Sequence, residues 1–287
     1  MIFPVRRRRS ARAARRAATV ARVAARTAFT LAAAAALALV GTHCYFVSPY
    51  ADLTSGSAPD GGAGGADARG VQFCKRLAPT PTFCRDFDEG EPVGAGFTFV
   101  GGSPGGTLDV DPAVGVSSTS SLHSAVPATA GGGPLEYVAE DVVVTRSLHV
   151  ELDALADGLG SATDEVTLLA VSGHDAAGVQ RSLLYYTTRT GAELEEESTP
   201  PFMNWPKPLP APPELGKWTH YALDLVLAGD APARVTLAVD GKKVLDDAAL
   251  GQSWPAGGYR VSFGLSWINA SRAAWSFHDD DLVIVAR

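Results

Sequence analysis

The feature that most constrains this chain is the strict alternation of apolar and polar residues in its C-terminal part. The alternation runs through residues 221–227, 234–239 and 261–265. A period of two is typical of strands that bury one face. Asp240-Gly241 separates two such runs, and an Asp-Gly pair in that place is a strong hairpin signal. The sequence therefore predicts a protein built from antiparallel strands.

Further strands are predicted over most of residues 71–287, and no stretch there has a helical period. They cover residues 83–88, 97–100, 107–110, 142–152, 165–171, 182–188, 242–245 and 275–285. About eleven short strands in one domain favour a two-sheet antiparallel β-sandwich of the jelly-roll kind. Residues 191–216 hold seven prolines and are predicted to form a long, stiff loop.

The N-terminal segment differs sharply in charge from the rest. Nine arginines precede Cys44, and the first acidic residue is Asp52. An apolar run, predicted to be helical, follows from residue 27 to residue 40 or 47. A basic head before an apolar stretch is typical of membrane targeting. We therefore expect residues 1–47 to be a basic N-region with a signal peptide or a membrane anchor.

The fate of this segment stays open between cleavage, lipidation and retention. Cys44 is a candidate for lipidation, although His43 stands where a lipobox has a small residue. In each case the rest of the chain lies outside the cytoplasm, in the cell envelope or secreted. The whole chain has a net charge of −7, and the part after Cys44 is more acidic still. This balance argues against nucleic acid as a partner.

A linker and one domain complete the predicted organisation. Residues 48–70 are rich in Gly, Ala and Ser and have almost no bulky apolar side chain, so we expect a flexible, disordered linker. Residues 71–287 have a globular composition. Cys74 and Cys84 open this domain, and in an oxidising compartment they are predicted to form a disulfide.

Four short segments resemble the concanavalin A-like jelly rolls, which include the laminin-G-like domains. Residues 83–88, Phe-Cys-Arg-Asp-Phe-Asp, are similar to the opening strand of that group. The Gly-Lys-Trp of residues 216–218 and the Val-Thr-Leu-Ala-Val-Asp-Gly of residues 235–241 resemble its "G-x-W" strand and "V-x-V-D-G" hairpin. Residues 277–285 resemble its closing strand. The resemblance implies a jelly roll over residues 83–287 and a carbohydrate ligand. Composition and layout resemble those of uncharacterised secreted myxobacterial proteins.

One strand carries the nearest approach to a catalytic motif. His149, Glu151 and Asp153 share one face of it. Glu151-Leu152-Asp153 matches the first half of the Glu-x-Asp-x-x-Glu strand of laminarinase-like glycosidases. The second Glu is missing, so no acid is present to protonate the leaving group. The sequence therefore favours a protein without enzymatic activity. If the protein is an enzyme, the sequence favours a glycoside hydrolase. The alternative is a solvent-facing polar stripe.

Calcium is the one cofactor that the sequence suggests. Asp86 and Asp88 lie at the end of the first strand, and Asp279 and Asp281 lie on the last. If these strands pair, the four carboxylates become candidate ligands for an ion that needs six to eight oxygens. Neighbouring Asp residues point to opposite faces of a strand, which limits how many can serve one ion. The alternative is a solvated strand end.

Aromatic residues complete the candidate glycan site. Sugars stack on Tyr and Trp, and we name Tyr186 and Trp205 beside His149, Glu151 and Asp153. Trp205 could equally fold back as a lid over the core, and the parity of Trp267 predicts a place in the core. The sequence predicts a non-catalytic, lectin-like module tethered to the cell envelope. The alternative is a structural or protein-interaction domain of the envelope.

Overall fold

The computed structural model describes residues 73–88, 90–117, 119–128, 135–269 and 272–287. The predicted N-region, anchor and linker, with Cys44, lie outside the described residues. Within these ranges there is one helix, α2 (Phe73–Arg76), which is much too short to cross a membrane, and all other regular elements are strands. A disulfide joins Cys74 of this helix to Cys84, with a Cα–Cα distance of 5.7 Å.

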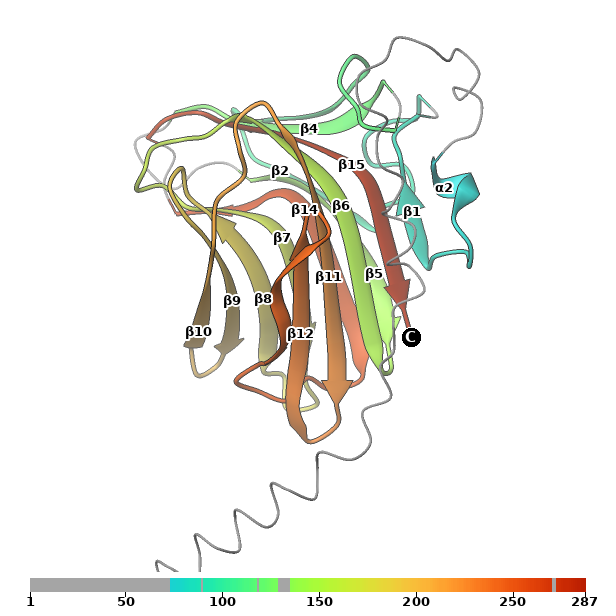
Figure 1. Cartoon of the computed structure of the whole chain (residues 1–287), viewed down its shortest axis with the longest axis vertical. Helices are drawn as coiled ribbons and strands as arrows, with labels where there is room; N and C mark the ends of the chain where they lie inside the picture. Colours follow the sequence, from blue (N-terminus) through green and yellow to red (C-terminus); the bar gives the residue numbers. More distant parts are fainter. Residues whose placement is uncertain (1–72, 89, 118, 129–134, 270–271) are drawn as a thin grey trace, which may run out of the picture. The chain divides into compact units, whose positions relative to one another are not determined.

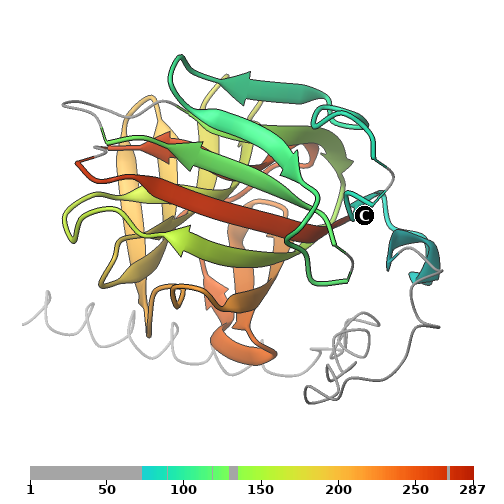
Figure 2. The same ribbon diagram turned by 90° about the horizontal axis from the view of Figure 1, so that it is seen from above.

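One sheet has eight strands and contains both the first and the last strand of the domain. Their order is β13-β12-β11-β6-β15-β4-β3, and β1 pairs with the second half of β15. Figure 2 shows β15, in red, crossing this sheet between the green strands β4 and β6. The strands are β1 (Phe83–Arg85), β3 (Thr107–Asp111), β4 (Ser121–Val126), β6 (Ser147–Gly158), β11 (Trp218–Ala228), β12 (Ala231–Val239), β13 (Lys242–Ala249) and β15 (Trp275–Ala286).

The other sheet has seven strands in the order β10-β9-β8-β7-β14-β5-β2. Both sheets are antiparallel and lie face to face, which confirms the predicted all-β sandwich (Figure 1). The strands are β2 (Phe99–Gly102), β5 (Glu136–Val144), β7 (Val166–His174), β8 (Gln180–Thr187), β9 (Ala192–Thr199), β10 (Met203–Leu209) and β14 (Gly257–Ile268).

The core lies between the two sheets and follows from the alternation in the sequence. Leu148, Val150 and Leu152 of β6 face inward, and so do Val261 and Phe263 of β14, each with at most 1% of its surface exposed. Burying one such side chain stabilises the fold by about 1.5–3 kcal/mol. The polar residues between them must therefore face outward, and these two outer faces are where a functional site can form.

Two segments differ from the sequence prediction. The single strand predicted at 142–152 is a hairpin, in which β5 ends at Val144 and β6 begins at Ser147. The prediction of a loop at 191–216 is wrong, because strands β9 and β10 occupy most of this segment. Its prolines fit because β10 is an edge strand, where missing N–H groups cost no ladder hydrogen bonds.

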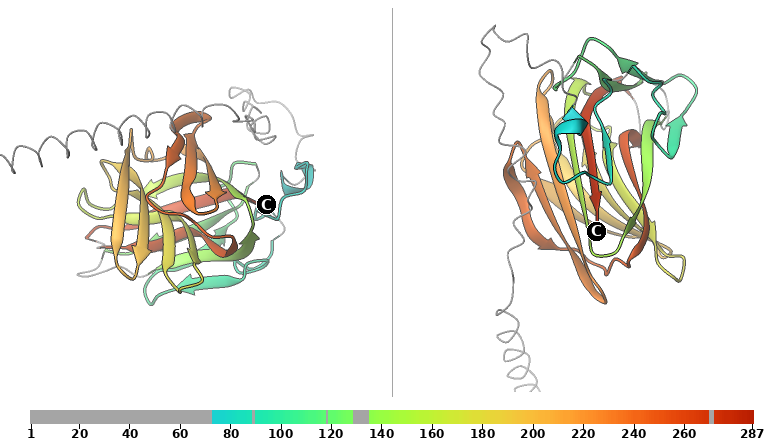
Figure 3. Two further views of the ribbon diagram at one scale, coloured as in Figure 1. Left: turned by 90° about the horizontal axis from the view of Figure 1, so that it is seen from below. Right: turned by 90° about the vertical axis from the view of Figure 1, so that its right-hand side faces the viewer.

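The termini of the domain meet on the eight-stranded sheet. Phe83 pairs with Ile284 and Arg85 with Leu282, so β1 lies beside the end of β15 (Figure 3, right). The backbone N–H of Cys74 donates to Asp86 Oδ2 at 3.1 Å, which ties α2 to the end of β1. This arrangement brings acidic residues of the first and last strands into one region.

Candidate functional site

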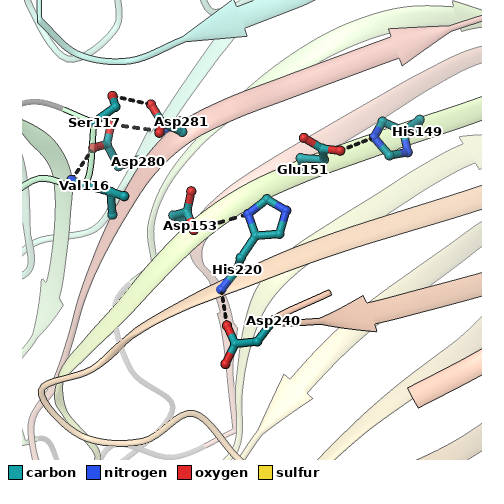
Figure 4. Close-up of polar contacts among 9 residues, drawn as sticks. All are labelled: Val116, Ser117, His149, Glu151, Asp153, His220, Asp240, Asp280 and Asp281. Atoms are coloured by element: carbon teal, nitrogen blue, oxygen red, sulfur yellow. Dashed lines mark hydrogen bonds and ion pairs between the residues drawn. The ribbon is translucent and has the colours of Figure 1, made fainter. Parts of the chain in front are cut away.

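The row His149, Glu151 and Asp153 lies on the outer face of the eight-stranded sheet, as the alternation along β6 predicts. His149 Nε2 lies 2.7 Å from Glu151 Oε1 (Figure 4). His149 Nδ1 lies 2.8 Å from Asp224 Oδ1 on the neighbouring strand β11. His149 and Glu151 are only 9% and 4% exposed.

The charge state of His149 follows from its two carboxylate partners. Burial lowers the pKa of the imidazole, but the hydrogen bonds and charges of Asp224 and Glu151 outweigh it and raise the pKa to about 9. At neutral pH the ring is thus an imidazolium that donates to both carboxylates. Such a buried ion triad joins β6 to β11, and its ring nitrogens are not available to accept a proton.

A second pair continues along the same face. His220 Nδ1 of β11 lies 3.2 Å from Asp153 Oδ1, and the backbone N–H of His220 donates to Asp240 Oδ1 at 3.0 Å (Figure 4). Burial lowers the pKa of His220, but Asp153 outweighs it and the net shift is upward. Asp240 has a φ of +50° in the predicted Asp-Gly turn. The pair therefore joins β6, β11 and the β12–β13 hairpin.

Aspartates of β15 hold the connection between β3 and β4. Asp280 Oδ2 accepts the backbone N–H of Val116 at 2.8 Å, and Asp281 Oδ1 accepts the hydroxyl of Ser117 at 2.6 Å (Figure 4). Burial, and then the charges of other aspartates, raise the pKa of Asp280 to about 8 and of Asp281 to about 7. Both carboxyls thus retain protons to unusually high pH.

The predicted calcium ligands do not all meet. Asp279 is fully buried, and neither of its carboxylate oxygens has a hydrogen-bond partner among the described residues. Burial raises its pKa to about 8 and the backbone of Gly264, on β14 of the other sheet, lowers it in part, so the side chain faces the core. Asp86, Asp88 and Asp281 lie close enough that the first two raise the pKa of the third. Asp86 Oδ1 is buried without a hydrogen-bond partner.

This partial grouping does not amount to a metal centre. In the described part of the chain, no three His, Cys, Asp or Glu side chains are grouped so that they could hold a metal ion. The structure brings three of the four predicted ligands near one another, and calcium binding stays a prediction.

The two predicted aromatic residues lie on the other sheet and face opposite ways. Tyr186 of β8 is on its outer face. Trp205 of β10 pairs with Glu196, whose side chain turns away from that face. The Trp205 ring covers Gly251 so closely that a Cβ there would come within 2.7 Å of it. Trp205 thus folds back, and the five predicted glycan residues do not form one site.

Sequence reasoning missed a row of carboxylates on β9. Glu193, Glu195 and Glu197 alternate with Leu194 and Glu196, which are at most 1% exposed and face inward. Glu196 accepts a hydrogen bond from Trp254 Nε1 at 2.9 Å. The period-two spacing of the three other glutamates was the available signal, and the predicted loop concealed it.

Two aromatic residues lie beside these carboxylates. Across the strands, Glu193 is opposite Tyr186, Tyr186 is opposite Thr167, and Thr167 is opposite Trp267. The rings of Tyr186 and Trp267 meet edge to face at 5.2 Å, and the Tyr186 hydroxyl donates to Glu197 Oε1 at 3.4 Å. A register shift between Phe263 and Trp267 turns Trp267 outward, 41% exposed, so the predicted core position is wrong.

We call these five residues the glutamate face: Glu193, Glu195, Glu197, Tyr186 and Trp267. Burial, and then the charge of Glu195, raise the pKa of both Glu193 and Glu197. Burial and the nearby glutamates also raise the pKa of Tyr186, which keeps its hydroxyl as a donor. The face thus combines groups that can give and take a proton with aromatic surface.

Solved structures of other proteins share the fold of this chain, whereas sequence comparisons find no match. No protein-family model matches the sequence, and no curated protein matches it significantly. Among solved structures, an endo-β-1,4-glucuronan lyase from the fungus Trichoderma reesei has a TM-score of 0.57 at 12% identity, over 72% of this chain and 96% of that one. The cellulose-induced protein Cip1 has a TM-score of 0.50 at 17% identity, over 71% and 97%. These likenesses show a shared two-sheet β-sandwich fold.

One sequence prediction is corrected by this comparison. The prediction of a non-catalytic, lectin-like module is wrong, because an endo-β-1,4-glucuronan lyase, which is an enzyme, shares the sandwich. A polysaccharide as the partner agrees with the comparison.

Proposed function

We propose that this protein is a carbohydrate-active enzyme that cleaves a polysaccharide lying across the glutamate face. The observation that carries the proposal is the row of three carboxylates on one outward strand face, beside Tyr186 and Trp267. Aromatic rings suit the apolar faces of sugar rings, and paired carboxyls are what glycosidic cleavage requires. The glucuronan lyase of similar fold supports a polysaccharide as the substrate class.

Two neighbouring glutamates have the properties of an acid and a base. The raised pKa of Glu197 favours a proton on this carboxyl, which it can give to the glycosidic oxygen. Glu195, two residues earlier on the same face, would take a proton from a water that attacks the anomeric carbon. The Cα atoms of residues i and i+2 of a strand are about 6.6–6.8 Å apart. Side chains on such Cα atoms can place their carboxyl groups at the separation of about 6.5–9.5 Å that inverting pairs require.

Elimination, the chemistry of a lyase, fits this face less well. Removing the proton beside a uronate carboxylate requires a positive or hydrogen-bonding group that stabilises the added charge. Arg260 lies on the outer face of the same sheet, but both ends of its guanidinium are bound to Asp141, at 2.8 and 2.9 Å. The glutamates would repel a uronate. We therefore propose hydrolysis.

We further propose that the enzyme works outside the cytoplasm, tethered to the cell envelope or secreted. The support is the nine-arginine head, the apolar run that follows it, and the linker composition of residues 48–70. The disulfide between Cys74 and Cys84 agrees with an oxidising compartment.

The test is the release of reducing ends from a panel of purified polysaccharides by the full-length chain and two variants. Glu197→Gln keeps the size of the side chain and removes its acid, so we expect about a 100-fold loss or more. Glu214→Gln, an exposed residue just before β11 of the other sheet, is the matched control and should keep its activity. Absence of cleavage of every polysaccharide by the wild type, or an unimpaired Glu197→Gln, would overturn the proposal.

A further inference from the structure

We propose that this protein has a second catalytic site, a Ser–His–Asp array of Asp109, His123 and Ser276 that hydrolyses small, uncharged esters. The array lies on the eight-stranded sheet and is therefore separate from the glutamate face. Three observations carry the proposal: the two contacts of His123, the strands that hold them in place, and the difference between His123 and the other histidines of this sheet.

The ring of His123 joins a carboxylate to a serine hydroxyl. His123 Nδ1 lies 3.0 Å from Asp109 Oδ1, and His123 Nε2 lies 3.1 Å from Ser276 Oγ. A carboxylate only accepts hydrogen bonds, so in the neutral ring Nδ1 carries the proton and Nε2 accepts from the serine O–H. A base that activates a hydroxyl, and that is itself oriented by a carboxylate, has these contacts in this order.

Three adjacent strands fix the array on the outer face of the sheet. His123 of β4 is directly opposite Asp109 of β3 on one side and His278 of β15 on the other. Phe277 of β15 is fully buried in the core, so Ser276 and His278 on either side of it face outward. The three side chains of the array thus come from three strands and meet because those strands are neighbours.

A bulge leaves space beside the serine. Ser276 is opposite Gly158 of β6, but the next residue, Phe277, is opposite Ala156, so β6 has one extra residue at this point. A Cβ on Gly158 would lie 3.3 Å from the backbone nitrogen of Ser276 and 3.4 Å from its Cβ. The glycine thus keeps open a place that any other residue would fill. Bulges are frequent next to active sites, where they re-aim side chains.

His123 differs from the other histidines of this sheet. His149 has a carboxylate at each ring nitrogen, and the Nε2 of His220 is buried without a hydrogen-bond partner. His278 Nδ1 lies 3.1 Å from the Ser121 hydroxyl, and its ring stacks on that of His123 at 4.7 Å. Among the described histidines of the sheet, His123 is the one with a carboxylate at one nitrogen and a serine at the other.

The reaction that this array can perform is transfer of an acyl group to water. Ser276 Oγ adds to the ester carbonyl carbon while its proton passes to His123 Nε2, and Asp109 stabilises the imidazolium. The bond from this carbon to the ester oxygen breaks, and the leaving oxygen takes the proton from Nε2. A water then adds to the acyl-serine and gives a proton to Nε2. The bond to Oγ breaks, Oγ takes that proton, and the acid leaves.

The surroundings restrict the substrate to a small and uncharged ester. The side chain of His123 is 23% exposed and that of Asp109 is 59% exposed, so a small molecule can reach the array. Carboxylates surround the neighbouring His278 and would repel an anionic ester: Asp109, Asp111 and Asp157. Burial, and then the charge of His123, lower the pKa of His278 on balance, which keeps this ring neutral beside the imidazolium. An acetyl ester of a neutral alcohol or sugar meets these conditions.

The experiment follows the hydrolysis of p-nitrophenyl acetate by the full-length protein, corrected for the spontaneous rate. Ser276→Ala and His123→Gln should each lower the protein-dependent rate about 100-fold or more, because they remove the nucleophile and the base. Ser266→Ala is the matched control and should keep the rate. Ser266 is a half-buried strand serine like Ser276, but its hydroxyl contacts a backbone carbonyl.

Covalent labelling provides a second measurement that needs no turnover. A fluorophosphonate probe should form one adduct, located on Ser276 by mass spectrometry of the digested protein. The adduct should be absent in Ser276→Ala and should form as in the wild type in Ser266→Ala. A wild type without ester hydrolysis or adduct, or a rate that Ser276→Ala leaves unchanged, would overturn the proposal. Neither result bears on cleavage at the glutamate face, which is measured with other substrates.

Discussion

At the scale of single residues, the most consequential contacts join side chains that are far apart in the sequence. His149 meets Asp224 across 75 residues, and His220 meets Asp153 across 67. Alternation along a strand predicts that His149, Glu151 and Asp153 share a face, and the structure agrees. The sequence could not show that β11 brings a partner for the histidine, because that depends on which strands become neighbours.

The buried triad gives a stability prediction. Glu151→Gln leaves His149 with one charged partner in a buried place, and breaking a buried ion pair costs about 3–5 kcal/mol. We expect the free energy of unfolding at pH 7, measured with a chemical denaturant, to fall by about this amount. Glu214→Gln, whose ion pair with Lys217 is exposed, is the control and should change it little. An unchanged stability of Glu151→Gln would mean that the triad does not exist in solution.

The same triad sets a pH dependence. The pKa of His149 is about 9 in the folded protein, above its usual value of 6.5. The contribution of the triad is therefore fully present below about pH 6.5 and is lost as the pH rises through 9. Thermal unfolding followed between pH 6 and pH 10 should show this loss in the wild type. It should be smaller in Asp224→Asn, where one of the two carboxylates that raise the pKa is neutral.

At the scale of elements, alternation predicted the sandwich well and its irregularities poorly. The strands around residues 221–227, 234–239 and 261–265 lie as predicted. The register shift before Trp267 reverses the side on which that residue lies, and no residue pattern marks it. Strands β9 and β10 were missed because glutamates and prolines are unusual in strands, and only the place of β10 at an edge explains them.

The meeting of β1 and β15 gives a prediction for the aspartates of the last strand. The folded-state pKa of Asp281 is about 7 and its ordinary value is 3.8. The folded protein therefore holds more protons than the unfolded chain between these values, and its stability should fall as the pH rises through this range. Asp281→Asn keeps an oxygen for the Ser117 hydroxyl and cannot ionise. Its thermal midpoint should fall less than that of the wild type between pH 5 and pH 8.

The same measurement tests the calcium prediction. If calcium binds among Asp86, Asp88 and Asp281, millimolar calcium at pH 8 should raise the thermal midpoint of the wild type and leave that of Asp281→Asn unchanged, because ligand binding stabilises the folded state. A wild-type midpoint that does not respond to calcium or to a chelator would contradict the prediction.

At the scale of the whole molecule, the two outer faces have different properties. The face of the eight-stranded sheet carries ionic contacts that join strands and a connecting segment, and His149 and Glu151 there are largely buried. The face of the seven-stranded sheet carries Glu193, Glu195 and Glu197 beside Trp267, and of these Glu195 is 7% and Trp267 is 41% exposed. Composition shows that the chain after Cys44 is acidic, but only the assignment of strands to sheets shows on which face each acidic residue lies.

The measurement that tests the central claim most directly is product analysis in water enriched in heavy oxygen. The full-length protein is incubated with partly acetylated chitosan, a neutral β-glucan and alginate, and the fragments are weighed by mass spectrometry. Hydrolysis on the glutamate face predicts that each new reducing end carries one heavy oxygen, in the wild type and not in Glu197→Gln. Unsaturated fragments, each lighter by one water than the hydrolysis product and free of the label, would show elimination and contradict the account.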